Sequence, residues 1–506
     1  MLVVVALGMA GCARPPAVRA DPARLARADA ELLQGCYDCL VAARTDYRAL
    51  AAGANRPVLL SRVFEADLLL ALREKELDLP ASDAIAEARR IAAELPLELE
   101  AARYVALVDA ISGDPPGESR NEVLASAAAH ALSPDERAEL RTWLSRSLLR
   151  PPIRDYLRLA LDCAYPVTGG VRPPEAARGA SPLLAYRAAI CELGLVSALS
   201  AVRDREPRFI ETSYFIANIE LATAMLDGPG HAGEHLAEAL ARFPASPAIT
   251  YLSGAHDLLV EDYPEALRRF DRALALLPAH DRALLGRIIC LTNLGRHQDA
   301  IAAATRLLRI NEDSRGDAYY WRARNHRALH QLADARRDIA AARAVAATAD
   351  ILSLAGFIEY EQADLDPAQA DLTAAIGMAS DCTARWYLAL VHHQRKRWLA
   401  AGQAFDDARA CYRDRAGDTA TRLQALQARA DLDPAYRERA AAGLQGSIDA
   451  DRKQQHLAEL MAASHLVAGG DLVAARPLVD LAAEDPALAD QVTKLRTRLD
   501  ATPHAP

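Results

Sequence analysis

A small residue returns about every 34 residues through the middle of this chain. Alanine occupies the equivalent positions at intervals of 34, 34, 35, 33 and 33 residues: Ala232, Ala266, Ala300, Ala335, Ala368 and Ala401. A second set of compact residues keeps pace with it: Ala239, Ala273, Leu307, Ala342, Ala375 and Ala408. Larger packing residues lie between the two sets: Leu236, Phe270, Ile339, Leu372 and Phe405. A constant period of this length predicts an array of stacked structural units.

Each unit reads as two short amphipathic helices joined by a tight turn, most clearly in residues 247–280. Pro244 and Pro278 each close a unit, as proline does after a helix end. Only 5% of the residues are aromatic, and few stretches alternate as strands do. One helical hairpin cannot bury its apolar face alone, so the units must stack on one another. The sequence therefore predicts an all-α fold.

The spacing within the units resembles the tetratricopeptide repeat, a helix–turn–helix of 34 residues. Gly254, Ala266, Phe270, Ala273 and Pro278 match its pattern in 247–280. Two later units match through Ala323, Ala335 and Ala342, and through Gly356, Ala368 and Ala375. The resemblance covers 213–414 well and is weaker in 25–206 and after 417. It implies a right-handed α-solenoid of stacked repeats.

The resemblance also implies that the first helix of every repeat lines a concave groove that binds protein segments. Carried onto this chain, the protein-binding positions are Tyr251, Leu285, Tyr320, Arg324, Arg327, Phe357, Tyr360 and Trp386, with Ala255, Leu258, Ile289, Asn293, Asp317, Leu390 and His393 at the remaining groove positions. This mixture of aromatics and a small basic cluster suits an extended peptide or an amphipathic helix that carries an acid. The alternative is that the same aromatics pack on the neighbouring repeat. The Lys and Asn pair that clamps chaperone tails is absent.

The first twelve residues are apolar and end in Met9-Ala10-Gly11-Cys12, which resembles a bacterial lipobox. The resemblance implies that Cys12 is lipidated, and Ala13 rather than Asp favours the outer membrane, with the protein facing the periplasm. A signal peptide begins with basic residues and has a longer apolar run, so the true start is expected to lie upstream. The alternatives are an ordinary cleaved signal and a cytosolic adaptor with a meaningless apolar start.

The chain is expected to divide into six parts. These are a signal segment (1–11), a Pro-rich tether (12–24), a helical region with degenerate repeats (25–164), a Pro/Gly-rich linker (165–182), the repeat array (183–416), and C-terminal repeat and capping helices (417–506). In the N-terminal region, residues 23–52 read as a hairpin or one long helix. Helices are also expected at about 134–149 and 152–164.

No motif assembles a catalytic site, and the expectation is a non-enzyme without cofactor or bound metal. The net charge of −9 with interspersed signs disfavours nucleic acid as a partner. One alternative is a zinc hydrolase, because His231-Ala232-Gly233-Glu234-His235 spells an inverted zinc-protease motif. Cys36 and Cys39 have the spacing of a redox pair but are expected inside a helical run, and the cysteines read as small buried hydrophobes. If the chain is exported, a disulfide is allowed, but the sequence alone does not assign one. The function favoured is therefore a protein-interaction scaffold with unidentified protein partners.

Overall fold

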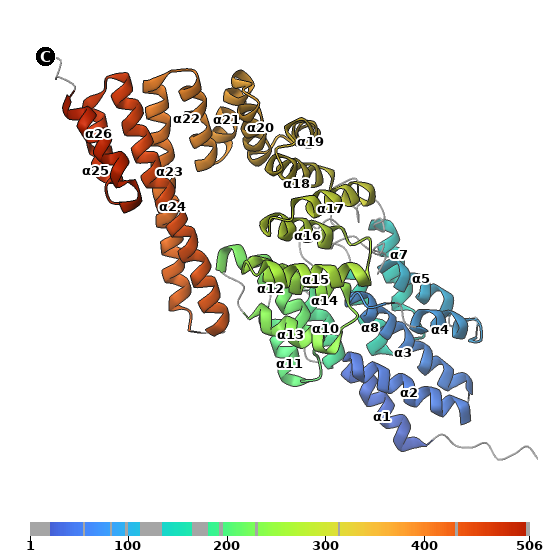
Figure 1. Ribbon diagram of the computed structural model, residues 1–506. Helices are drawn as coiled ribbons and strands as arrows, with labels where there is room; N and C mark the ends of the chain where they lie inside the picture. Colours follow the sequence, from blue (N-terminus) through green and yellow to red (C-terminus); the bar gives the residue numbers. More distant parts are fainter. Residues whose placement is uncertain are drawn as a thin grey trace, which may run out of the picture. The chain divides into compact units, whose positions relative to one another are not determined.

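The computed structural model describes residues 21–53, 56–80, 83–96, 100–111, 134–163, 181–191, 196–227, 231–311, 314–430 and 434–501. Within these segments the chain forms α-helices and one short 3-10 turn, and no strand (Figure 1). The predicted all-α fold is confirmed. None of the helices in the described segments combines the length and the apolarity that crossing a bilayer requires. The helices fall into two compact units, Met1–Thr223 with Ala232–Ile249, and Ala224–His231 with Thr250–Pro506.

The first unit contains the helices of the degenerate region. They are α1 (Pro22–Gln34), α2 (Tyr37–Gly53), α3 (Arg56–Glu76), α4 (Asp83–Ala92), α5 (Ala101–Ile111), α7 (Pro134–Ser145), α8 (Pro151–Cys163), α10 (Pro182–Cys191), α11 (Val196–Arg205), most of α12 (Glu211–Asp227), and α13 (Ala232–Arg242). Helices α7 and α8 lie where the sequence predicts them. The expected linker at 165–182 falls almost entirely outside the described residues.

The second unit holds the regular array. Its helices are α14 (Pro247–Leu259), α15 (Tyr263–Leu276), α16 (Asp281–Asn293), α17 (His297–Ile310), α18 (Arg315–Ala328), α19 (Leu332–Val345), α20 (Ala349–Glu361), α21 (Leu365–Met378), α22 (Cys382–Gln394), α23 (Trp398–Ala428), α24 (Pro434–Gly469), α25 (Leu472–Ala482), the 3-10 turn η2 (Pro486–Leu488) and α26 (Ala489–Ala501). Paired helices of about 14 residues follow one another up to α22, as the 34-residue period predicts.

The recurring small residues are the points where helices touch. All six alanines that open the second helices are fully buried. Glycine also allows close helix contact around Phe270. Its ring lies between Gly254 of α14 and Gly286 of α16, the first helices of two consecutive repeats. A Cβ atom added at Gly254 would lie 2.9 Å from Phe270 Cε1, and one at Gly286 would lie 2.4 Å from Phe270 Cζ. The small side chains thus let the backbones approach and hold one large ring in place.

The turn inside each repeat places one residue in the left-handed region. These residues are Glu261 (φ 59°), Gly295 (71°), His330 (55°), Ala363 (61°), Lys396 (56°) and Gly470 (88°). Each lies five residues before the small residue that opens the next helix, so the turn is repeated along with the packing. The following amide then bonds back across the turn, for example Arg296 N to Leu291 O at 2.8 Å, as in a helix-ending Schellman motif.

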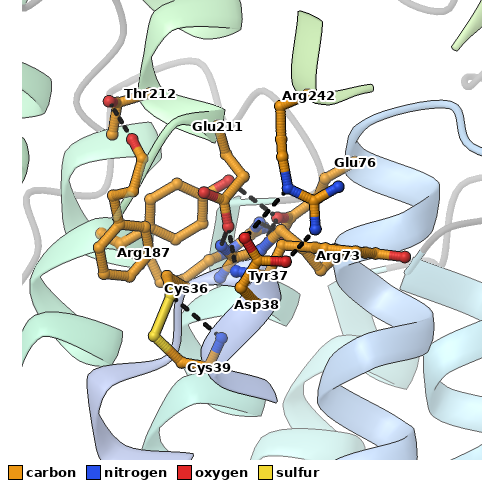
Figure 2. A network of polar contacts seen from close by, with 12 residues as sticks. Cys36, Tyr37, Asp38, Cys39, Arg73, Glu76, Arg187, Glu211, Thr212 and Arg242 are labelled. Atoms are coloured by element: carbon orange, nitrogen blue, oxygen red, sulfur yellow. Dashed lines mark hydrogen bonds and ion pairs between the residues drawn. A yellow bond between two sulfur atoms is a disulfide. The ribbon is translucent and has the colours of Figure 1, made fainter. Parts of the chain in front are cut away.

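Buried charges join several helices of the first unit (Figure 2). Arg73 of α3 is fully buried, and its Nη1 donates to Glu211 Oε1 of α12 at 2.8 Å. Arg73 Nε lies 3.0 Å from Glu76 Oε2, and Arg187 Nη1 of α10 lies 2.5 Å from the other Glu76 oxygen. The Arg73 guanidinium also stacks 3.7 Å from the ring centre of Tyr186. Burial raises the pKa of the Glu211 carboxyl, and the charge of Arg73 acts against this rise.

The structure corrects the interpretation of four cysteines. Disulfides join Cys36 to Cys39 and Cys382 to Cys411, with Cα atoms 4.9 Å and 5.4 Å apart. Cys36 does not lie inside a helix, because Gly35 (φ 77°) ends α1 and α2 begins at Tyr37. The pair therefore occupies a helix N-terminus, where Cys39 N donates to Cys36 Sγ at 3.1 Å (Figure 2). Cys290 is free and buried, as the sequence predicts.

Two long helices interrupt the repeat pattern near the C-terminus. Helices α23 and α24 have 31 and 36 residues and pack against each other as an antiparallel hairpin (Figure 1). The expected boundary between residues 416 and 417 falls within α23. The two helices expected at the end of the chain are present as α25 and α26.

Candidate functional site: the inner face of the repeats

The first helices of the repeats form one continuous face within the second unit. Helix α16 contacts α18, α18 contacts α20, and α20 contacts α22, each across one repeat. Among the described residues, the second helices α15, α17, α19 and α21 have at most marginal contacts of this kind. Helices on the inner side of a bend lie closer together than those on the outer side. The first helices therefore line the inner face, as the tetratricopeptide pattern implies.

Most of the predicted groove residues pack partly against neighbouring helices and are partly exposed. The side chains of Tyr251, Leu285, Tyr320, Phe357, Tyr360 and Trp386 are all half-buried. Each packs against a buried apolar cluster of the array. The ring of Tyr251, for example, lies 6.0 Å from the Phe270 ring, and the ring of Trp386 lies 4.9 Å from the Phe405 ring. These residues hold neighbouring helices together and leave only part of their surface for a ligand, so their role in binding stays a prediction.

One hollow of about 400 Å³ opens on this face between α16, α17, α18 and α20. It is lined by Thr292, Asn293, His297, Arg324, Arg327, Ala328, His330 and Glu361. The structure thus brings together the two predicted basic residues and Asn293. It does not place the predicted aromatics or Leu285 in the lining.

The two arginines of the hollow have different surroundings. Arg327 donates from Nε and Nη2 to Glu361 Oε1 at 2.8 Å and 2.6 Å, and from Nη2 to the Tyr387 hydroxyl at 2.5 Å. Its charge is therefore balanced within the protein. Arg324 is exposed, and in the described chain no carboxylate pairs with it. Its guanidinium lies 5.0 Å from the ring centre of Trp321. Burial raises the pKa of the Tyr320 hydroxyl, and the nearby charge of Arg324 acts against this rise.

A buried asparagine fixes the orientation of His297. Asn325 is fully buried, and its Nδ2 donates to Thr292 Oγ1 at 2.8 Å and to Trp321 O at 2.7 Å. Both amide hydrogens are thus used, so Oδ1 must accept from His297 Nδ1 at 2.8 Å. The ring then presents Nε2 as its remaining nitrogen. Thr292 is fixed too, because its hydroxyl donates to Ile288 O at 2.8 Å.

Three polar residues at the hollow were not predicted from the sequence: His297, Asn325 and Glu361. Each is an isolated polar residue with no local motif, and its partner lies in an adjacent repeat. A usable signal exists in the spacing, because Arg327 and Glu361 are 34 residues apart, which is one repeat. Residues one period apart come side by side when repeats stack, so opposite charges at that spacing predict a pair between repeats.

The histidines of the inverted zinc-protease motif are not placed as that motif requires. His231 precedes α13, which begins at Ala232, while His235 lies within the helix. The described residues contain no group of three His, Cys, Asp or Glu side chains that could hold a metal ion. The structure therefore gives the zinc-hydrolase alternative no support. Cys12, the expected lipidation site, lies outside the described residues.

A family model matches part of the array, and solved structures of repeat proteins match larger parts of the chain. A family model described as tetratricopeptide repeat matches residues 260–318 and 355–416. A tetratricopeptide repeat protein from Parabacteroides merdae ATCC 43184 is 14% identical, with 44% of this chain and 87% of that chain covered and a TM-score of 0.36. YrrB, described as a TPR protein with an unusual peptide-binding site, is 19% identical, with 40% and 100% covered and a TM-score of 0.32. Yeast Tom70 is 13% identical, with 96% of each chain covered and a TM-score of 0.35. A search of curated proteins gives no significant match.

Proposed function

Because the chain is a tetratricopeptide repeat protein, we propose that it is a non-catalytic scaffold that binds a segment of another protein on the inner face of its array. The observation that carries the proposal is the face itself, formed by contacting first helices and opened by a polar hollow. Half-buried aromatics beside the hollow offer rigid apolar contact at little cost in side-chain entropy. A rigid, mixed polar and apolar groove is typical of sites for extended peptides or amphipathic helices.

The experiment is a comparison of inner-face and outer-face variants in a pull-down from the native host. Asn293→Trp adds bulk to an exposed position of the hollow and removes no core contact. Arg268→Trp places the same indole ring at an exposed position of the second helix α15. The scaffold proposal expects one bound protein that is lost in the first variant and kept in the second. Equal capture by both variants would refute the assignment of the inner face.

The proposal extends to the place where the scaffold works. Residues 9–12 resemble a lipobox, so Cys12 would carry a lipid that anchors the chain in the bacterial envelope, at the outer membrane and facing the periplasm. The two disulfides support an oxidising compartment, because structural disulfides persist in the periplasm and are rare in the cytosol. Metabolic labelling with an azide-bearing fatty acid should mark the wild type and not Cys12→Ser. Unlabelled wild-type protein in the soluble cytosolic fraction would contradict the anchor and leave the scaffold function intact.

A further inference from the structure

Among the described residues, one arginine of the hollow has no carboxylate partner. Among its lining residues, Arg327 is paired with Glu361, whereas Arg324 has no carboxylate partner in the part of the chain that the structure describes. The Arg324 guanidinium lies 5.0 Å from the ring centre of Trp321 and is near enough to Tyr320 to act on its hydroxyl, so two aromatic side chains lie beside this charge. A guanidinium presents a fork of N–H donors that matches a planar anion.

A second donor lies in the same hollow. His297 gives its Nδ1–H to the buried Asn325, so Nε2 is the ring nitrogen left to meet a ligand. Donation from Nε2 to an anion uses the second ring proton, because Nδ1–H is already committed to Asn325. Asn325 is held in turn by Thr292 and Trp321, so a chain of bonds extends from the core to this one atom. Exposed His330 lies at the rim of the same hollow.

We propose that the hollow binds a single carboxylate of the partner segment, held by Arg324 and by His297 Nε2. This inference rests on the proposed function, because it names the chemical group that a bound segment would present there. The carboxylate could be the C-terminus of the partner or an Asp or Glu side chain, and both have the same chemistry. A volume of about 400 Å³ is within the range of small-ligand sites and holds the end or one turn of a peptide rather than a folded domain.

The charges favour a carboxylate over a phosphate. A phosphate group carries nearly two negative charges and calls for several cationic or amide donors. Within the segments that the structure describes, the hollow offers one guanidinium without a carboxylate partner and two imidazoles, those of His297 and His330, and the Glu361 carboxylate lies in its wall. A lysine-bearing segment is disfavoured because its ammonium would face Arg324. A singly charged planar anion is the group that these side chains balance.

The test is a titration of the full-length protein with short probes, followed through the histidine ring signals in NMR spectra of histidine-labelled protein. One acidic probe is an acetylated alanine tripeptide with a free C-terminus, and its neutral match is the same peptide as the amide. The other pair is an acetylated tripeptide amide that carries a glutamate or a glutamine side chain. The His297 signal, identified by its loss in His297→Gln, should shift saturably with at least one acidic probe and with neither neutral one. A dissociation constant in the millimolar range is expected for one such contact.

Variants at exposed positions then test the role of Arg324. Arg324→Gln should weaken the binding of the acidic probe at least tenfold, because a hydrogen bond to a charged group contributes that much or more. Arg337→Gln, at an exposed arginine of the second helix α19, should leave binding unchanged. Matching melting temperatures would show that both variants remain folded.

The outcomes separate the two proposals. Equal shifts with neutral probes, no shift with any probe, or tighter binding of inorganic phosphate than of either acidic probe would overturn the carboxylate site. A partner that is captured through the inner face but unaffected by Arg324→Gln would leave the scaffold function standing and refute this site. Probe binding without any captured partner would do the reverse. The acidic probe that binds also identifies the source, a chain terminus or an acidic side chain.

Discussion

Replacing Gly286 with alanine tests whether the array is held together by close helix contacts around Phe270. The added Cβ would lie 2.4, 2.6 and 2.7 Å from three carbons of the Phe270 ring. Ordinary carbon contacts are at about 3.5–4.0 Å, so the ring or the helix must move by roughly 1 Å. The ring cannot turn away easily, because it is almost fully buried and Gly254 already touches it from another helix.

Two free-energy terms of opposite sign decide the result. Overpacking a rigid core costs about 1–3 kcal/mol, and alanine gains about 1 kcal/mol over glycine inside a helix. The lack of free space around Phe270 places the first term near its upper end, so Gly286→Ala should lose about 1–2 kcal/mol. Gly417→Ala in α23 is the matched control, because no atom lies within 4 Å of the added Cβ. That variant should gain up to about 1 kcal/mol.

Hydrogen exchange measured by mass spectrometry is the suitable assay, because a repeat array need not unfold as one unit. Exchange should become faster in the peptides of α15 and α16 in Gly286→Ala, and slower in those of α23 in Gly417→Ala. Adding Phe270→Leu to Gly286→Ala should recover part of the loss relative to the sum of the single changes. If Gly286→Ala is as stable as the wild type or more stable, the packing argument is wrong.

Three further predictions concern charge and covalent links. The pKa of Glu359 is raised to about 7, first by burial and then by Asp371; its ionisation therefore opposes folding, and the stability of the wild type should fall as pH rises from about 5 to 7. Glu359→Gln should remove this fall, so the variant should be more stable than the wild type by about 1–2 kcal/mol at pH 8 and by almost nothing at pH 4.5. Urea titrations at both pH values measure the difference, and a difference that does not depend on pH would refute the raised pKa of Glu359. Arg73→Met leaves buried carboxylates without their cation and should cost about 3–5 kcal/mol in thermal or urea unfolding of the first unit; a loss below about 1 kcal/mol would contradict the role of the network. Changing Cys382 and Cys411 to serine opens a loop of about 30 residues and should cost about 3 kcal/mol. Dithiothreitol should destabilise the second unit of the wild type and not that of the variant, which keeps the Cys36–Cys39 disulfide of the first unit; equal sensitivity of the second unit in both proteins would show that the Cys382–Cys411 bond is not formed.

The repeat period allowed the array to be predicted from the sequence because close contacts accept only small residues. Ala266, Ala300 and Ala335 mark these contacts at a constant spacing, and all three are fully buried. The length of α23 was not predicted, because the repeat pattern ends the unit at residue 416, whereas the helix continues to Ala428. Gly417 does not end the helix, because it lies in an open position where a helix tolerates glycine.

The chemistry of the inner face was only partly predictable. Arg324 and Arg327 were identified by their repeat positions, but which of them is neutralised depends on Glu361 in the following repeat. Burial of Asn325, which orients His297, depends on how adjacent repeats stack. The aromatic groove positions also contribute to the packing of the array. Tyr251 and Trp386 pack between helices, so their removal would test stability and binding together.

The central claim, that the inner face of the array holds a protein segment, is tested most directly by photo-crosslinking in the native host. A small photoreactive diazirine amino acid would replace Ala328 and His330 in separate variants, because both are exposed residues of the hollow that make no contact with the proposed carboxylate. The exposed outer-face residues Arg268 and Arg337 would be replaced in two others. Both inner positions should crosslink to the same protein, within one short segment of it, and neither outer position should do so. Crosslinks to that protein from the outer positions, or to unrelated proteins from the two inner ones, would contradict it.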